Sequence, residues 1–389
     1  MSMLGLTKLP YIPQEVAENI IDEFSRDIRS LSHCALTCRR WHPRARYHLM
    51  TSIRVQSRED LFSIRDYISS NPWMSSAVRS LYISPGYTES KALSLLEAVS
   101  VLLLSRLPNL RSFGMRHSAS MSLNTRVRGM PLSFHAHALI WIRTYLHVEE
   151  LSLGPVRFRT GGELARFLVA LPRLQRLECT SLRIVDQKNS WVSSTGMMRF
   201  RDSCRRLSEV TLQQTDELAV RLIIQTAASS LEVLRCDLGV PFGSQRNVHK
   251  ALDLSDLNLL HSLDFITLSK LSDPSSFTAE FGDVIEILTT SPPNQLRAIT
   301  FTCSSKYMAR MAQGWSDIYV VQQWGLLEET ILTLGTPHVT ISMPTAKRNR
   351  LAFWSKIFHR RFPRLHEGKL LHVRCSSGGR CQRAGTSWS

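Results

Sequence analysis

A short pattern of apolar residues recurs through the middle of the chain. It consists of an apolar residue, two variable residues, a second apolar residue, one variable residue and a third apolar residue. Because the last two apolar positions are two residues apart, each copy has the alternation of a β-strand with one buried face. The pattern therefore predicts a series of similar strands. The eight copies begin at Val78, Leu110, Val148, Leu174, Leu207, Leu231, Leu263 and Leu296.

Stretches of helical periodicity lie between these predicted strands. A strand followed by a helix, repeated every 24 to 38 residues, predicts parallel strands joined by helical crossovers. Over residues 77–344 this α/β arrangement resembles an irregular leucine-rich-repeat solenoid, although the regular asparagine positions of such repeats are mostly absent. A doubly wound sheet is the main alternative. The predicted helices include Glu89–Ser105, Leu132–Leu146, Glu163–Leu171, Asp216–Ala228 and Ala279–Leu288.

Residues 9–50 predict a separate unit of three short helices. Pro13 suits the first turn of a helix, and Val16 and Ile20 then fall on one stripe. A second helix from about Ser30 is expected to run until Pro43 interrupts it. So short a unit buries little surface, which leaves apolar residues for a partner protein to cover. The alternative is a helical hairpin that docks on the repeats.

The same segment resembles an F-box. The F-box pattern is Leu-Pro-x-Glu-Leu, an Ile-Leu pair and a later Val-Cys-Arg-Arg-Trp; an isoleucine stands here where the first leucine is usual. The variant is similar to F-box domain-containing proteins of basidiomycete fungi. Both halves occur at the expected separation, over about a tenth of the chain. The matching residues are Ile12-Pro13-Gln14-Glu15-Val16, Ile20-Ile21 and Leu36-Thr37-Cys38-Arg39-Arg40-Trp41.

The resemblance implies a function. F-boxes bind a Skp-type adaptor and through it a cullin, and repeats that follow an F-box hold a protein substrate for ubiquitin transfer. The chain is then expected to be a non-catalytic substrate receptor of a ubiquitin ligase, with its substrate unknown. The alternative is a repeat scaffold that binds protein or nucleic acid outside any ligase. By motif position, the residues that contact the adaptor or hold the helices behind that contact are Ile12, Pro13, Val16, Ile20, Ile21, Leu36 and Trp41.

Two further segments complete the predicted organisation. Residues 51–76 are expected to form a linker with a helix that starts at Ser57 and ends before Pro72. Residues 345–375 predict a basic capping helix and strand that close the solenoid, with a nuclear-import signal or an anionic-surface contact as alternatives. Residues 376–389 have the composition of a disordered tail.

The charge of the chain is unevenly distributed. The net charge is +16, with balances of +2, +11, −7 and +10 over residues 1–100, 101–206, 207–344 and 345–389. A uniformly basic nucleic-acid binder has no acidic third quarter, so the balances indicate separate surfaces of opposite sign.

No residue pattern predicts catalysis, a cofactor or a metal site. Glycine-rich phosphate loops and nucleophile elbows are absent from the sequence. His33, Cys34, Cys38 and His42 are better explained by the F-box motif than as zinc ligands. Cys179 and Cys236 are expected to be buried in the repeats. The absence of a leader or a membrane-spanning stretch, with eight cysteines, predicts a reducing location in the cytoplasm or nucleus.

Overall fold

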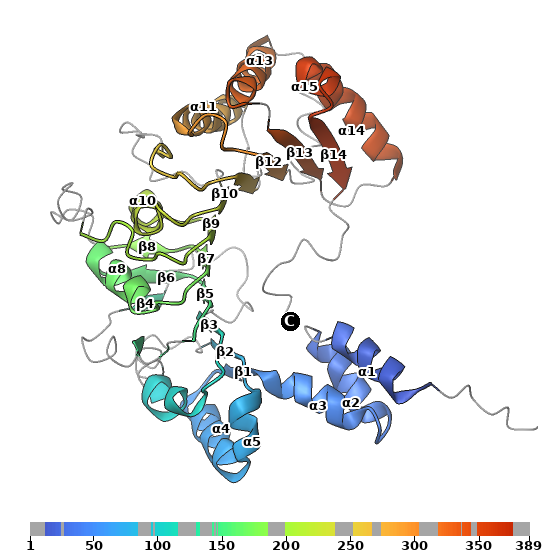
Figure 1. Cartoon of the computed structure of the whole chain (residues 1–389), viewed down its shortest axis with the longest axis vertical. Helices are drawn as coiled ribbons and strands as arrows, with labels where there is room; N and C mark the ends of the chain where they lie inside the picture. The colour runs from blue at the N-terminus through green and yellow to red at the C-terminus, as the bar shows by residue number, and fades with distance from the viewer. Residues whose placement is uncertain are drawn as a thin grey trace, which may run out of the picture.

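The structure is a computed structural model of the 389-residue chain. It is an α/β molecule built on a parallel sheet of 11 strands, which follow an arc with helices along its outer side (Figure 1). The residues that the structure describes are 12–24, 27–84, 95, 98–115, 130–132, 142–143, 145, 147–185, 199–237, 252–266, 274–302, 318–335, 337–343 and 348–375.

The strands of the large sheet lie side by side in the order of the chain, and each pairs in parallel with its neighbours. This order has no reversal point, which a doubly wound sheet requires. The prediction of parallel strands with crossovers is confirmed. The strands are β1 (Ser52–Val55), β2 (Ser80–Ile83), β3 (Ser112–Met115), β5 (Glu150–Leu153), β7 (Arg176–Thr180), β9 (Glu209–Gln213), β10 (Val233–Asp237), β11 (Ser262–Ile266), β12 (Ala298–Thr302), β13 (His338–Met343) and β14 (Leu371–Cys375).

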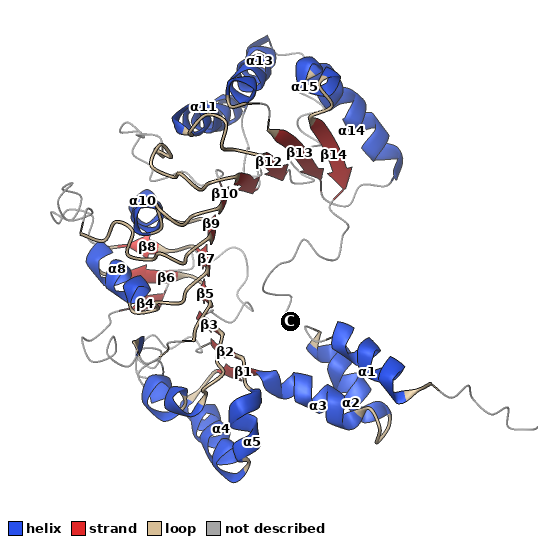
Figure 2. Ribbon diagram, in the orientation of Figure 1, coloured by secondary structure: helices blue, strands red, loops and turns tan. Residues whose placement is uncertain are grey.

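A second, three-stranded parallel sheet contains β4 (Met130–Leu132), β6 (Val156–Phe158) and β8 (Arg183–Ile184). Figure 2 shows that it lies on the helical side of the large sheet, near α8 and α10. The helices of the repeats and their flanks are α4 (Arg58–Ser70), α5 (Pro72–Ala77), η1 (Leu104–Arg106), α8 (Gly161–Val169), α10 (Glu217–Thr226), α11 (Pro274–Thr290), α13 (Ile318–Thr333), α14 (Arg348–Arg361) and α15 (Pro363–Glu367).

Local sequence signals explain where several helices begin. The Asp216 carboxylate accepts a hydrogen bond from the Ala219 N–H at 2.8 Å and caps α10. Ser57 and Asp60 form a capping box at the start of α4, which confirms the predicted helix there. Part of the predicted helix 89–105, and most of 132–146, lies outside the described residues. Leu132 itself ends a strand rather than starting a helix.

Register explains why the repeated apolar pattern builds one core. Leu81, Phe113 and Leu151 are Cα partners on successive strands and are all buried. The same column continues through the later strands, so each strand adds buried apolar area to that of its neighbour. Cys179 and Cys236 occupy such buried positions, as predicted. Burial raises the pKa of the Cys236 thiol to about 12, which leaves it protonated and unreactive.

The seventh copy of the pattern was placed three residues too late. In β11, Leu263 pairs with Leu234 and Ile299, and Phe265 pairs with Phe301. Leu263 is therefore the second apolar position of its copy, and the first is Leu260, which is fully buried. The error arose because Ile266 and Leu268 also fit the alternation, and only pairing with neighbouring strands distinguishes the two registers.

The predicted limits of the sheet, 77 and 344, are also wrong. β1 lies within the predicted linker and pairs with β2, so the sheet begins at Ser52. At the other end, β14 pairs with β13 and belongs to the same sheet. The expected capping helix is present as α14, with Phe358 buried against the repeats.

The second face of the large sheet is open. Alternate strand residues are half-buried or exposed, and the described helices lie on the other side (Figure 2). Close packing occurs locally on this face, where a Cβ at Gly114 would lie 2.7 Å from a ring carbon of Tyr82. Only glycine fits beneath that ring.

Candidate functional site

Three helices precede the sheet and have a small core of their own. They are α1 (Gln14–Glu23), α2 (Ile28–Thr37) and α3 (His42–Thr51), and α3 runs directly into β1. Figure 1 shows them beyond the β1 end of the sheet. Their core contains Ile21, Leu31, Cys34 and Ala45 and is separate from the core of the repeats. Four buried side chains are few, so the unit has little capacity to hide further apolar groups.

Four of the seven predicted site residues are large apolar side chains that remain exposed. The exposed fractions are 47% for Ile12, 47% for Val16, 40% for Ile20 and 84% for Leu36. Val16 and Ile20 are four residues apart on α1, so they lie on one helix face. We call these four residues the exposed apolar set. Exposed apolar surface of this kind is typical of protein-binding sites.

The other three predicted residues have different environments. Ile21 is fully buried in the small core, so it can support a contact only by holding the helices in place. Trp41 is partly buried against that core. Pro13 is exposed and precedes the first turn of α1 as its N-cap residue. The seven residues therefore divide into an exposed group and a supporting group, which the sequence did not distinguish.

The junction between α2 and α3 differs from the prediction. The Asp27 carboxylate accepts hydrogen bonds from the N–H groups of Arg29 and Ser30, which starts α2. α2 then ends at Thr37, and Pro43 lies in the first turn of α3 instead of interrupting α2. Proline is favoured in a first turn because its missing N–H has no helical partner there.

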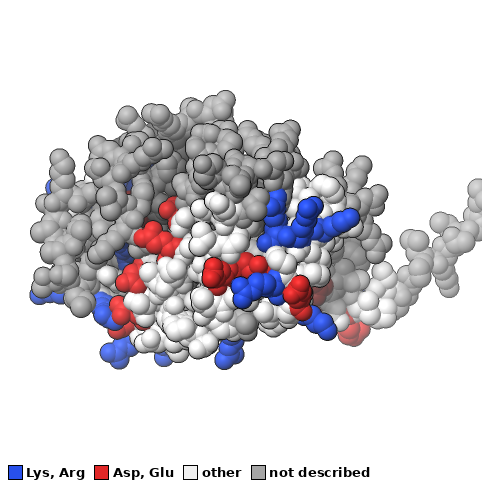
Figure 3. Space-filling view, turned by 90° about the horizontal axis from the view of Figure 1, so that it is seen from above, with Lys and Arg blue, Asp and Glu red and all other residues white. Residues whose placement is uncertain are grey.

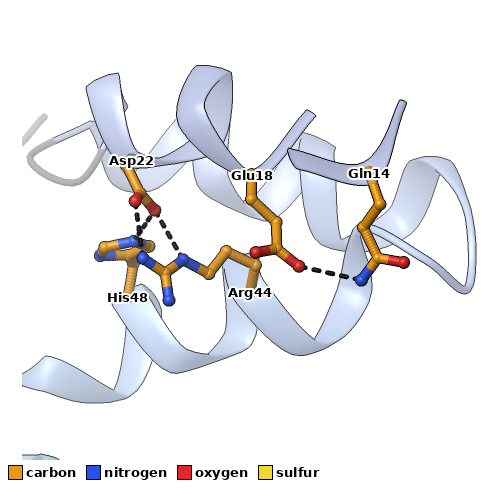
Figure 4. A network of polar contacts seen from close by, with 5 residues as sticks. All are labelled: Gln14, Glu18, Asp22, Arg44 and His48. Atoms are coloured by element: carbon orange, nitrogen blue, oxygen red, sulfur yellow. Dashed lines mark hydrogen bonds and ion pairs between the residues drawn. The ribbon is translucent and has the colours of Figure 1, made fainter. Parts of the chain in front are cut away.

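A polar network joins the first and third helices on a different face of α1 (Figure 4). The Asp22 carboxylate accepts two hydrogen bonds from Arg44, at 2.7 and 2.6 Å, and one from His48 Nε2 at 2.7 Å. The hydrogen bond from Arg44 is the main reason that the pKa of Asp22 falls to about 2. The sequence offered no signal for this network beyond the i,i+4 spacing of Arg44 and His48, because Asp22 is far away in the chain.

The residues weighed as zinc ligands do not gather around one point. Cys34 is buried in the small core, whereas Cys38 is exposed. The His42 ring nitrogen Nδ1 lies 3.1 Å from the Ala35 carbonyl oxygen. Across the described residues, no three His, Cys, Asp or Glu side chains are grouped so that they can hold a metal ion. Within the same residues, no helix is both long and apolar enough to cross a bilayer.

Charged groups of both signs lie next to each other at the other end of the molecule. Figure 3 looks onto the end that carries α13 to α15, and its described surface has Lys and Arg beside Asp and Glu. On this view the two signs are interspersed, in contrast to the separate surfaces that the charge balances indicated.

Comparison with known proteins adds no family to this geometry. The sequence matches no family model, and no curated protein is significantly similar to it.

Proposed function

We propose that the chain is the substrate-recognition subunit of a Skp–cullin–F-box type ubiquitin ligase. In this proposal the three N-terminal helices are an F-box that binds the Skp-type adaptor, and the repeats form an irregular leucine-rich-repeat solenoid that binds a protein substrate. The observation that carries it is the exposed apolar set, whose members occupy F-box motif positions.

The physical basis of the adaptor contact is burial of apolar surface. Each large apolar side chain that becomes fully buried contributes about 1.5–3 kcal/mol. Val16 and Ile20 lie on one face of α1 and present their side chains together. The Asp22–Arg44 contact holds α1 against α3, so the stripe is positioned before the partner arrives, which lowers the entropic cost of binding.

The mechanism requires no chemical step from this chain. A receptor of this kind raises the effective concentration of the substrate near the ubiquitin-conjugating enzyme and orients the acceptor lysine. Transfer of ubiquitin takes place elsewhere in the assembly. The proposed cellular location, cytoplasm or nucleus, follows from that role.

Adaptor binding tests the proposal directly. We expect the full chain to bind a purified Skp-type adaptor in a calorimetric titration. The double variant Val16→Ala/Ile20→Ala is expected to bind about 100-fold more weakly, because two buried side chains lose most of their apolar area. Trp41 is unsuitable for this test because it packs against the small core.

A matched control removes two exposed apolar side chains elsewhere. Val101 and Val185 are 47% and 62% exposed and lie outside the three-helix unit, so Val101→Ala/Val185→Ala is expected to leave adaptor affinity unchanged. Wild-type affinity in the Val16/Ile20 variant, or no adaptor binding by the intact chain, would contradict the proposal. Salt-sensitive oligonucleotide binding without adaptor binding would instead favour a scaffold that works outside any ligase.

A further inference from the structure

The open face of the large sheet has an acidic centre. On strands β5 to β11, five carboxylates and two guanidinium groups stand at the alternate positions that do not enter the core. We call this section the acidic strip. Its acidic residues are Glu150, Glu178, Glu209, Asp237 and Asp264, and its basic residues are Arg176 and Arg235.

In-register pairing places these groups in rows across the strands. Glu178, Thr211, Arg235 and Asp264 are successive Cα partners on β7, β9, β10 and β11. Neighbouring strands are about 4.8 Å apart, so the rows present charges at regular intervals. Residues that are 24 or more positions apart in the sequence thus form one surface.

The acidic strip already accommodates guanidinium groups of this chain. Arg235 forms ion pairs with both Glu209 and Asp264, the latter at 3.0 Å. Arg176 and Glu150 are 2.8 Å apart. A guanidinium on this face therefore lies within reach of carboxylates on adjacent strands, and the planar fork of arginine suits such contacts.

The sign of the strip is opposite to that of the whole protein. The chain carries a net charge of +16, yet this face has more carboxylates than basic groups. None of the large apolar side chains that are exposed among the described residues lies on a strand of the sheet. A partner that fits this face is thus selected by positive charge and hydrogen bonding, not by apolar burial.

We propose that the acidic strip is the docking surface for an extended, Lys- and Arg-rich segment of a protein partner. The inference rests on the proposed function in taking the repeats as the substrate-binding part, and it names the class of substrate. An extended segment that crosses the strands advances about 10 Å in three residues, which is about two strand spacings. A basic residue at every third position therefore meets every second strand.

A labelled peptide probes this surface. The probe is a fluorescein-labelled 12-residue peptide, (Arg-Ser-Ser)4, titrated with the full chain and followed by anisotropy at several salt concentrations; (Glu-Ser-Ser)4 serves as the negative control. We expect salt-sensitive binding of the basic peptide only. The variant Glu178→Gln/Glu209→Gln is expected to weaken binding about tenfold.

The matched variant Glu286→Gln/Glu329→Gln removes two exposed carboxylates from α11 and α13 and is expected to leave peptide affinity unchanged. Equal weakening by both double variants would show a response to net charge alone and would overturn the inference. Absence of peptide binding by the wild-type chain would do the same.

Two further measurements identify other occupants. A chain that ends at Cys375 and binds the peptide more than about tenfold tighter would show that residues 376–389 compete for the strip. A dimer in sedimentation that the Glu178/Glu209 variant abolishes would assign the strip to a second copy. Either result overturns the inference. Adaptor affinity is measured on the same samples: its loss with peptide binding intact contradicts the proposed function alone, and peptide loss with adaptor binding intact contradicts this inference alone.

Discussion

At the scale of single residues, neighbours in the sequence have opposite environments. Ile20 is 40% exposed, whereas Ile21 next to it is fully buried. One residue advances about 100° around a helix, so a narrow core covers one of the two side chains and leaves the other in solvent. This difference decides which motif residue is available for a partner and which one holds the three helices together.

The Asp22 network predicts a pH-dependent contribution to stability. The folded pKa of about 2 lies below the ordinary value of 3.8, so the contribution is present above about pH 4 and is lost as the pH falls towards 2. We expect Asp22→Asn to lower the thermal midpoint of the three-helix unit near neutral pH. The difference from wild type should shrink as the pH approaches about 2.5.

Glu18→Gln is the control for this prediction, because Glu18 accepts one exposed hydrogen bond from Gln14, at 2.9 Å. Hydrogen exchange of the α1 and α3 amides reports the stability of this unit apart from the repeats. A wild-type advantage over Asp22→Asn that stays constant across the pH range would show that the carboxylate charge is not responsible.

At the scale of elements, a buried carboxylate joins two helices of the C-terminal cap. Glu328 on α13 is 5% exposed and accepts a hydrogen bond from the Leu365 N–H of α15 at 2.9 Å. The first N–H groups of a helix have no partner within that helix. Glu328 therefore supplies an acceptor that α15 lacks on its own.

We expect Glu328→Ala to destabilise the cap by about 1–3 kcal/mol, because a buried N–H loses its acceptor. Glu328→Gln keeps a carbonyl oxygen at that position and should cost less. The exposed neighbour Glu329 is the control, and its alanine variant should change stability by no more than about 0.5 kcal/mol. Urea unfolding, with hydrogen exchange at Leu365, measures these effects; equal losses in both alanine variants would contradict the assignment.

At the scale of the whole molecule, each strand depends on its two neighbours. In such an array the end units must present a surface that tolerates water. The ring centroids of Trp324 and Phe362 are 5.0 Å apart, and those of Trp324 and Phe358 are 6.1 Å apart. These contacts close the apolar core at the β14 end.

A chain that ends at Met343 lacks α14, α15 and β14 and leaves Trp324 and the edge of β13 uncovered. We expect its thermal midpoint to fall by at least about 5 °C and higher oligomers to form through the exposed edge. A chain that ends at Cys375 keeps every described element and is the control. Size-exclusion chromatography and thermal unfolding measure both; a monomeric short chain with unchanged stability would contradict the capping role.

Much of the strand series was predictable because strand alternation is a local property. The failures occurred where local patterns were ambiguous. Leu263 fitted two registers, and Met50-Thr-Ser-Ile53-Arg-Val55 fits the repeated pattern but was overlooked within the predicted linker. β14 escaped detection because Gly368 stands where the first apolar position would be.

The candidate site was predictable to the same extent. The amino-acid order was sufficient to place apolar residues in excess near Val16 and Ile20 and to locate the helix caps, since both follow from spacing along a few residues. Only the folded chain separated Ile21 from Ile20, joined Asp22 to Arg44 and aligned Glu178 with Arg235 across three strands. These outcomes depend on which distant segments meet, because burial and electrostatic contact are properties of neighbours in space.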